Sequence, residues 1–257
     1  MLENVKSTVD DVELVVRRRA QLVQAAITLF SRVGYHMATV KDIADEAGVS
    51  PGLIYQYVPD KQDLLFLALL HICQRNKEEI PAKLKGTDDP ISRLHVAIDS
   101  YTRIIAANQQ AVVLTYRETK SMKREYIDTL KRMELETNAL IANCIDECIR
   151  AGHLERVNVE LLVYRIITGA HAWALKYWRL SKIVSLDEYL EKSIHSCWTT
   201  LLTPKGRRRY DELQAKQLLD GPQGQTPEQP PDTAPKRRAK ATKNGATRAP
   251  RAPASKP

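Results

Sequence analysis

A short stretch in the first quarter of the chain, TVKDIADEAGVSPGLIYQYVPDK, constrains the fold more than any other feature of the sequence. Apolar residues recur at helical spacing from residue 40 to residue 47, and Thr39 precedes them as an N-terminal cap. Gly48 ends this first helix, whereas Ser50 and Pro51 have the cap and first-turn chemistry of a second one. A turn of about three residues therefore joins two short helices, which is the spacing of a helix-turn-helix.

The second helix of this pair carries residues suited to a large, charged partner. Glycine in the first turn of a helix costs about 1 kcal/mol relative to alanine, so Gly52 indicates that a partner approaches the backbone closely. Tyr55 and Tyr57 present hydroxyl groups that suit phosphate oxygens. In a helix-turn-helix, the start of the second helix enters the major groove of DNA. We therefore expect this segment to bind double-stranded DNA.

Residues 25–65 resemble the DNA-binding head of the TetR family of bacterial transcriptional regulators. The positions that carry the resemblance are Ala25, Ala26, Leu29, Phe30, Gly34, Thr39, Ile43, Ala44, Ala47, Gly48, Val49, Ser50, Gly52, Tyr55, Tyr57, Lys61 and Leu64. Val58 departs from the pattern, because the family usually has phenylalanine there. Beyond this region, only the size of the chain and its helical character match the family.

The resemblance and the motif together predict a set of DNA contacts. The residues in this set are Arg17, Arg18, Thr39, Val40, Ser50, Pro51, Gly52, Leu53, Tyr55, Tyr57 and Lys61. Residues 50–53 are expected to face base edges, whereas Tyr55 and Lys61 are expected to contact phosphates.

The net charge of the chain gives no support for DNA binding by this segment. The chain carries a formal charge of +8, but residues 204–257 hold 13 Lys+Arg and 5 Asp+Glu, which leaves the rest of the chain neutral.

Helical periods and caps divide the chain into four parts of an all-α protein. We expect a flexible N-terminus at 1–12, a helix-turn-helix domain at 13–60, a helical ligand-binding and dimerisation domain at 61–203, and a basic tail at 204–257 that is disordered from about residue 221. Within the helical domain, helices are predicted at 61–79, 91–108, 121–151 and 159–178, with a last one from residue 186. The TetR resemblance implies that the final two pair with their copies in a homodimer.

The helical domain also has the residue types of a ligand cavity, which are apolar and aromatic side chains with a few polar ends. The candidate ligand-binding residues are Tyr101, Ile105, Tyr116, Arg117, Tyr126, Trp173 and Tyr177. At helical spacing, the alternative is that most of them are ordinary core residues. The segment TYRETKS loosely resembles family members that sense acyl-CoA thioesters or fatty acids. We therefore predict an apolar small-molecule effector with an anionic or polar end, of acyl-CoA or fatty-acid type.

No residue pattern predicts an enzyme, a cofactor or a metal site. The six histidines are scattered singly, and no nucleophile, phosphate-loop or paired-carboxylate motif is present. The four cysteines include no C-x-x-C pair, and the sequence has no export segment and no apolar run of about 20 residues, which predicts a cytoplasmic protein without a membrane span. We predict a homodimeric TetR-type repressor that a ligand releases from a near-palindromic operator. Two alternatives stay open: an architectural protein that binds DNA without sequence preference, and a helical enzyme.

Overall fold

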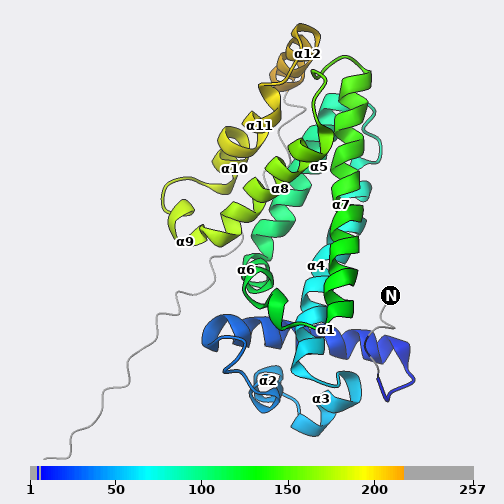
Figure 1. Cartoon of the computed structure of the whole chain (residues 1–257), viewed down its shortest axis with the longest axis vertical. Helices are drawn as coiled ribbons and strands as arrows, with labels where there is room; N and C mark the ends of the chain where they lie inside the picture. The colour runs from blue at the N-terminus through cyan, green and yellow to red at the C-terminus, as the bar shows by residue number, and fades with distance from the viewer. Residues whose placement is uncertain (1–4, 6, 217–257) are drawn as a thin grey trace, which may run out of the picture. The chain divides into compact units, whose positions relative to one another are not determined.

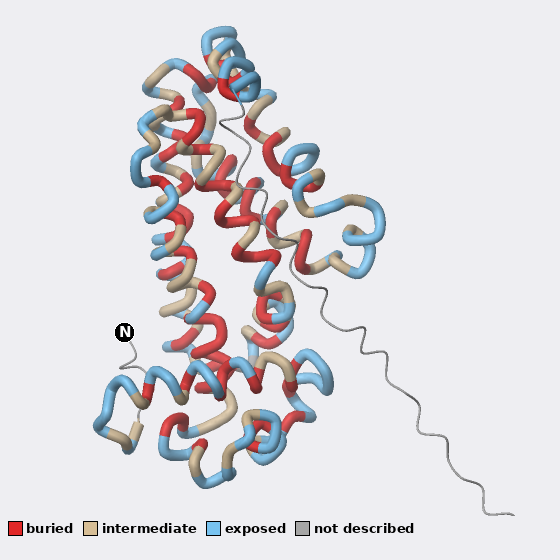
Figure 2. The backbone as a smooth tube through the Cα atoms, turned by 180° about the vertical axis from the view of Figure 1, so that it is seen from behind, coloured by how far each residue is buried: buried red, intermediate tan, exposed pale blue. Residues whose placement is uncertain are grey.

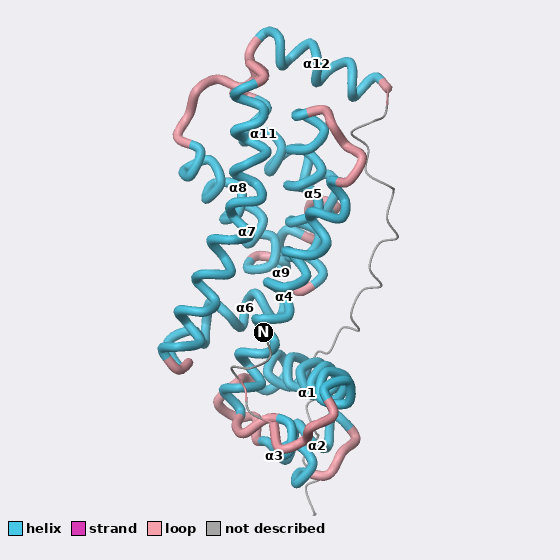
Figure 3. Tube along the Cα trace, turned by 90° about the vertical axis from the view of Figure 1, so that its right-hand side faces the viewer, coloured by secondary structure: helices cyan, strands magenta, loops and turns pink. Residues whose placement is uncertain are grey.

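The computed structural model describes Val5 and residues 7–216, and the regular elements in this range are helices (Figures 1 and 3). Three of them form an N-terminal unit, here called the head: α1 (Val12–Val33), α2 (Val40–Ala47) and α3 (Pro51–Tyr57). The remaining helices form the body: α4 (Lys61–Leu84), α5 (Pro90–Ala107), α6 (Gln109–Glu118), the 3-10 helix Thr119–Ser121, α7 (Arg124–Arg150), α8 (Val159–Leu175), α9 (Tyr177–Leu180), α10 (Leu186–Tyr189), the π-helix Leu190–His195, α11 (Ser196–Thr199) and α12 (Pro204–Ala215). The predicted all-α fold is confirmed.

The head folds because α1 presents one apolar face to the two shorter helices. Leu22 and Phe30 of α1 are buried in the same apolar cluster as Ile43 of α2 and Ile54 of α3. Val58, which replaces the phenylalanine usual in the TetR family, is fully buried in this cluster at the end of α3. The smaller side chain at this position therefore still contributes to the core of the head.

The segment before α1 packs on the head, which corrects the prediction of a flexible N-terminus at 1–12 for the residues that the structure describes. The side chain of Val5 is buried, and the backbone N–H of Thr8 donates to the carbonyl oxygen of Gln56 at 2.9 Å. The buried guanidinium of Arg19 donates to the carbonyl oxygens of Tyr57 at 3.0 Å and Val5 at 2.5 Å. Thr8 and Arg19 thereby satisfy the carbonyls of Gln56 and Tyr57 at the end of α3, which lack partners within the helix.

α4 is longer than predicted, since it passes through Pro81 and ends at Leu84. Proline removes one backbone donor and disfavours the helical conformation of the residue before it. Ile80 and Leu84 are both buried in the core of the body. Their burial stabilises the extra turn and offsets the cost of the proline, which is why the sequence-based boundary at residue 79 is too early.

The two C-terminal helices predicted at 159–178 and from residue 186 are each interrupted. α8 ends at Leu175, and the short helix α9 follows it. Ser185 begins the next helical run as predicted, because its hydroxyl accepts the N–H of Glu188 at 3.1 Å. That run then contains the π-helix, where Ile194 lies so close to Gly169 of α8 that a Cβ on Gly169 would be 2.9 Å from Ile194 Cδ1.

The body extends beyond residue 203, so the first part of the predicted tail at 204–257 is a packed helix. Tyr210 and Leu213 of α12 are buried in the core of the body. Gly206 permits a close approach, because a Cβ there would lie 2.0 Å from the carbonyl oxygen of His153. The Arg209 guanidinium also pairs with Asp89 at 2.7 Å. The predicted disorder from about residue 221 lies outside the described residues.

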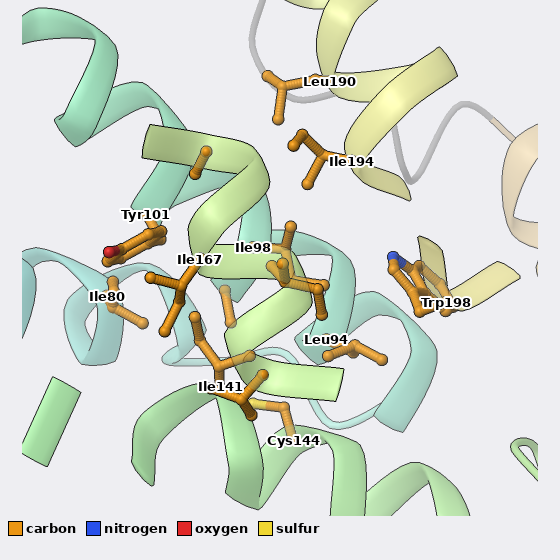
Figure 4. Close-up of a cluster of buried hydrophobic side chains, with 14 of the residues drawn as sticks. Ile80, Leu94, Ile98, Tyr101, Ile141, Cys144, Ile167, Leu190, Ile194 and Trp198 are labelled. Carbon is orange, nitrogen blue, oxygen red and sulfur yellow. The ribbon is translucent and has the colours of Figure 1, made fainter. Parts of the chain in front are cut away.

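Buried residues line the inner faces of the long helices (Figure 2). Figure 4 shows the centre of the body, where Leu94 and Ile98 of α5 meet Ile141 of α7, Ile167 of α8 and the fully buried Trp198 of α11. Within the described part of the chain, no helix combines the length and the apolar character needed to span a bilayer.

Four side chains, here called the joint, tie the start of α4, directly after the head, to the start of α7. Asp60 and Asp63 form a capping box, in which each side chain accepts the backbone N–H of the other residue, at 2.9 and 3.0 Å. Lys123, next to the start of α7, donates to Asp60 Oδ2 and Asp63 Oδ1 at 3.1 Å each. The hydroxyl of Tyr126 in α7 also donates to Asp63 Oδ1. The Asp63 carboxylate is therefore shared by the start of α4 and the start of α7.

Replacement of Lys123 with Met should lower the melting temperature by about 2–4 °C, because the buried Asp63 carboxylate loses a cationic partner. The expected loss of stability is only on the order of 1 kcal/mol, since the Lys123 side chain remains 40% exposed and water screens the pair. Lys120→Met is a matched control at an exposed lysine three residues earlier. Thermal unfolding measured by circular dichroism checks this expectation, and equal melting temperatures for both variants would contradict it.

Candidate nucleic-acid interface and ligand cavity

The helix-turn-helix has the turn and the first cap that the sequence predicts, whereas Ser50 makes no side-chain cap hydrogen bond at the start of α3. The Thr39 hydroxyl accepts the backbone N–H of Asp42 at 3.1 Å, and Asp42 Oδ2 accepts the backbone N–H of Thr39 at 2.9 Å. Gly48 then adopts the left-handed conformation, with φ 68° and ψ 34°. Its backbone turns the chain into α3, which begins at Pro51. The geometry of α2, the turn and α3 is thus set by local chemistry that can be read from the sequence.

α3 presents one solvent-facing side made of predicted DNA contacts. Ser50, Pro51 and Gly52 are exposed, Leu53 is half-buried and Tyr55 is 55% exposed. A Cβ on Gly52 would meet no atom within 4 Å. The packing of the protein itself therefore gives no reason for glycine at this position. Close approach of an external partner to the backbone at Gly52 stays a prediction from the sequence.

Two predicted phosphate contacts are used inside the head instead. Tyr57 is only 4% exposed and belongs to the apolar core of the head. The ammonium of Lys61 donates to the carbonyl oxygens of Tyr35 at 2.7 Å and Ala38 at 2.9 Å, and it lies 4.5 Å from the Tyr35 ring centroid. Lys61 therefore ties the start of α4 to the loop between α1 and α2, a role that no local sequence pattern predicts.

The other predicted contacts lie at the starts of α1 and α2. Arg17 is exposed, whereas Arg18 donates to Gln21 Oε1 at 2.9 Å. The start of α1 lies beside the end of α3, because the adjacent Arg19 donates to Tyr57. At the start of α2, Thr39 is exposed and Val40 is half-buried. These residues remain on the surface of the head, where they are accessible to a partner.

A cavity of about 110 Å³ lies in the body between five helices. Its lining comprises Leu69, Ile72, Cys73 and Asn76 of α4, Tyr101 and Ile105 of α5, Val112, Thr115 and Tyr116 of α6, Leu130, Glu134, Thr137 and Asn138 of α7, and His171 of α8. Three of the predicted ligand-binding residues, Tyr101, Ile105 and Tyr116, are therefore brought together here. Apolar side chains such as Leu69 and Val112 share the lining with polar ones such as Asn76 and Asn138, as expected of a small-molecule site.

The other four predicted ligand-binding residues lie away from this cavity. Arg117 is exposed on α6, because a helix turns by about 100° between Tyr116 and the next residue. Tyr126 belongs to the joint. Trp173 packs against Tyr189 at a ring-centroid distance of 5.1 Å and against Tyr177 at 5.9 Å. Residue type alone did not separate the cavity-facing aromatic residues from these core aromatic residues.

His171 connects two of the cavity tyrosines, and sequence reasoning missed it. Its Nε2 lies 2.8 Å from the Tyr101 hydroxyl, and its Nδ1 lies 2.8 Å from the Tyr116 hydroxyl. Burial lowers the pKa of His171 to about 4, so the ring is neutral near pH 7. A neutral imidazole donates one hydrogen bond and accepts one. One tyrosine therefore accepts from His171 and keeps its own proton available as a donor.

Asn76 and Asn138 were also missed, although Asn76 left a signal in the sequence. Asn76 stands between Ile72 and Ile80 at spacings of four residues, so it interrupts the apolar stripe of α4. The structure shows that both asparagines are buried, at 4% and 7% exposure. A polar side chain within an apolar helical stripe indicates a buried polar site, but the partner helices cannot be identified from one stripe.

Two helices line the cavity and also contact the head. α4 contributes Asn76 to the cavity and begins at the joint. α6 contributes Tyr116 to the cavity and ends at Glu118, whose carboxylate lies 3.2 Å from His36 Nε2 in the loop before α2. Figure 1 shows α4 running from the head into the body and α6 lying between α1 and α8. Two helices, α4 and α6, therefore connect the cavity directly to the head.

Comparisons with known proteins match both parts of this architecture. Residues 22–68 match bacterial regulatory proteins of the tetR family, and residues 87–181 match the tetracyclin repressor-like C-terminal domain. The chain is 42% identical over 205 residues to the HTH-type transcriptional regulator HbdR of Aromatoleum sp. (strain CIB), which covers 80% of this chain and 90% of that protein. It is 22% identical over 184 residues to the fatty acid metabolism regulator protein of Bacillus subtilis (strain 168), covering 68% of this chain and 95% of that protein.

Further relatives extend the same result. The HTH-type transcriptional activator FasR of Mycolicibacterium smegmatis is 24% identical over 185 residues, covering 70% of this chain and 81% of that protein. A solved regulatory protein of the tetR family from Rhodococcus RHA1 is similar with a TM-score of 0.64 and 18% identity, covering 71% of this chain and 96% of that chain. The structural likeness shows the fold, and the match to HbdR over most of both chains shows the family. This chain therefore belongs to the TetR family of bacterial transcriptional regulators, which are DNA-binding proteins.

Proposed function

We propose that this regulator is a repressor that binds a near-palindromic operator as a homodimer and is released when a small molecule enters the cavity of the body. The observation that carries the proposal is that α4 and α6 both line the cavity and both contact the head. A ligand that changes the position of either helix would change the orientation of the head. Coupling between the two sites then needs no element beyond these two helices.

The geometry of DNA makes such a change effective. Two heads that enter successive major grooves must be spaced by about 34 Å or a multiple of it. If one head moves out of register, binding of the first head no longer holds the second head close to its own half-site, and the gain in affinity from two linked heads is lost. A ligand that favours the released state tenfold shifts the equilibrium by about 1.4 kcal/mol, which a few contacts in the cavity can supply.

Exposed apolar residues on and after α8 support a dimer. Leu161 and Tyr164 lie three residues apart on α8 and are 67% and 37% exposed, while Trp178 of α9 is 68% exposed. Ile183, in the loop that follows, is 54% exposed. Trp173 and Trp198, which lie on the two C-terminal helical segments expected to pair between protomers, are buried within one chain. We therefore assign the contact between protomers to the exposed set, because solvent exposure of large apolar side chains is unfavourable.

An acyl-type effector is the candidate that the sequence favours. One of the similar proteins supports it by name, since it is a fatty acid metabolism regulator protein, and the loose resemblance of TYRETKS points the same way. The cavity volume of about 110 Å³ is below the roughly 300–1,000 Å³ of drug-sized ligand sites. We therefore propose that only part of an acyl ligand enters this cavity, or that α6 and α7 separate to admit more.

Footprinting on the DNA that flanks its own gene tests the proposal. We expect protection of a near-palindromic site with half-sites one helical turn apart, because each head reads one major groove. Octanoyl-CoA and octanoate serve as acyl probes, and a random duplex serves as the control for sequence preference. Equal binding to the random duplex would favour the architectural alternative. If neither probe changes operator binding, the proposal of an acyl-type effector is rejected, and the proposal of a ligand-released repressor is then tested with other ligands.

Gly52→Ala should weaken operator binding at least tenfold while preserving or slightly raising stability. Alanine favours the helix by up to about 1 kcal/mol, and the space around Gly52 is open, so the fold tolerates the methyl group. At the DNA surface, the same methyl group would collide with the groove. Fluorescence anisotropy with operator DNA and thermal unfolding measure the two effects. Lys131→Ala, at an exposed position on α7, is the control. Unchanged affinity in Gly52→Ala would show that α3 does not approach DNA at this residue.

A further inference from the structure

The cavity contains two buried carboxamides with unsatisfied polar atoms. Within the described part of the chain, neither Oδ1 nor Nδ2 of Asn138 has a hydrogen-bond partner, and Oδ1 of Asn76 has none. Both side chains line the cavity and are more than nine-tenths buried. Buried polar atoms are almost always hydrogen-bonded in folded proteins, and leaving them unpaired is costly. Two such residues around one cavity therefore indicate a site built to receive polar atoms.

The unsatisfied atoms of the two asparagines indicate which polar atoms a ligand must carry. Asn138 offers an acceptor and a donor from one planar group, so it matches a group that carries a donor and an acceptor side by side. Asn76 offers a further acceptor. Tyr101 and Tyr116 flank neutral His171, which leaves one of the two hydroxyls with an available proton. The cavity therefore presents both donors and acceptors, which is more than an acceptor-only ligand group would use.

The charges around the cavity oppose an anion. Within the described residues, no Lys or Arg side chain lines the cavity, and the only carboxyl group in the lining is that of Glu134, which is negative when ionised. Burial lowers the pKa of His171 to about 4, so this ring supplies no positive charge near pH 7. A buried carboxylate without a cationic partner is strongly unfavourable. Of the two ligand ends that the sequence predicted, the polar one fits this lining and the anionic one does not.

We propose that the cavity selects an uncharged ligand group with adjacent hydrogen-bond donor and acceptor atoms, of the primary carboxamide type, and rejects the carboxylate of the same shape. The carboxamide pairs with Asn138 through two parallel hydrogen bonds and donates to Asn76. The apolar part of the ligand lies against Leu69, Ile105 and Val112. This inference rests on the proposed function, because it specifies the ligand chemistry of the proposed effector cavity, and it restricts the acyl-type effector proposed there to one whose end in the cavity is uncharged.

Matched pairs of small probes test the charge selectivity on the full chain. Isobutyramide and benzamide are compared with isobutyrate and benzoate at pH 7.5, where both acids are anionic. We expect each amide to raise the melting temperature in a dose-dependent way, by about 3 °C at ten times its dissociation constant. Each carboxylate should bind at least tenfold more weakly. Titration calorimetry gives the dissociation constants independently of unfolding.

Variants on α7 and α4 locate the binding site. Asn138→Leu should abolish the amide-induced shift while leaving the melting temperature of the ligand-free protein unchanged or higher, because a buried unpaired amide is removed. Asn76→Leu should weaken amide binding and serves as a second variant if Asn138→Leu does not fold. Asn143→Leu is the matched control, since Asn143 is exposed on α7. It should respond to the amides as the wild type does.

Several results would overturn the proposal. Equal shifts from an amide and its carboxylate would remove the charge selectivity, and a larger shift from benzylamine would point to a cationic ligand paired with Glu134. No shift from either amide would mean that water molecules satisfy the asparagines. An amide shift that survives in both Asn138→Leu and Asn76→Leu would place binding elsewhere. These readouts do not involve DNA, so failure of the proposed repression in footprinting is distinguishable from failure of this inference.

Discussion

The arrangement of the helices around the start of α4, where the chain leaves the head, depends on the buried carboxylate of Asp63. It is 1% exposed, and it accepts hydrogen bonds from the backbone N–H of Asp60, from Lys123 and from Tyr126. A carboxylate removed from water requires such donors, because burial without them costs several kcal/mol. Its donors come from two separate segments of the chain. The first turn of α4 is therefore fixed to α7 by the same group that caps it.

Other contacts at the same place make α4 a shared element of both parts. Lys61 donates to carbonyls of the loop between α1 and α2, and Phe66 stacks on Tyr126 with ring centroids 4.1 Å apart. Further along α4, Asn76 lines the cavity. We propose that a ligand in the cavity acts on the joint along α4, because a helix resists bending over this length. α6 provides a second path through Glu118 and His36.

The sequence predicted those parts of the structure that local chemistry determines. The capping box at Thr39, the left-handed Gly48 and the start of the helix after Ser185 depend on residues within a few positions of one another, so they can be read directly. The exposed face of α3 followed from the same motif. The all-helical fold followed from periodicity.

Tertiary contacts decided the parts that the sequence did not predict. The sequence predicted that Lys61 contacts a phosphate. Its partners in the structure are the carbonyls of Tyr35 and Ala38, which lie more than 20 residues earlier in the chain and so leave no local signal. His171 looked isolated, yet it joins Tyr101 across 70 positions. α12 looked like part of a polar tail, but Tyr210 and Leu213 are buried on a surface made by distant segments. In each case the deciding partner is remote, and periodicity along one helix cannot identify it.

Hydrogen–deuterium exchange of the protein with and without operator DNA tests the central claim, which is that the head and the cavity are energetically coupled. Coupling between two sites is reciprocal, so a partner bound at the head must also act on the cavity. The account predicts that operator DNA changes amide exchange in residues 69–76 of α4 and 112–118 of α6, as well as in the head. A random duplex at the same concentration is the control. Exchange changes confined to α1, α2 and α3 would contradict the account.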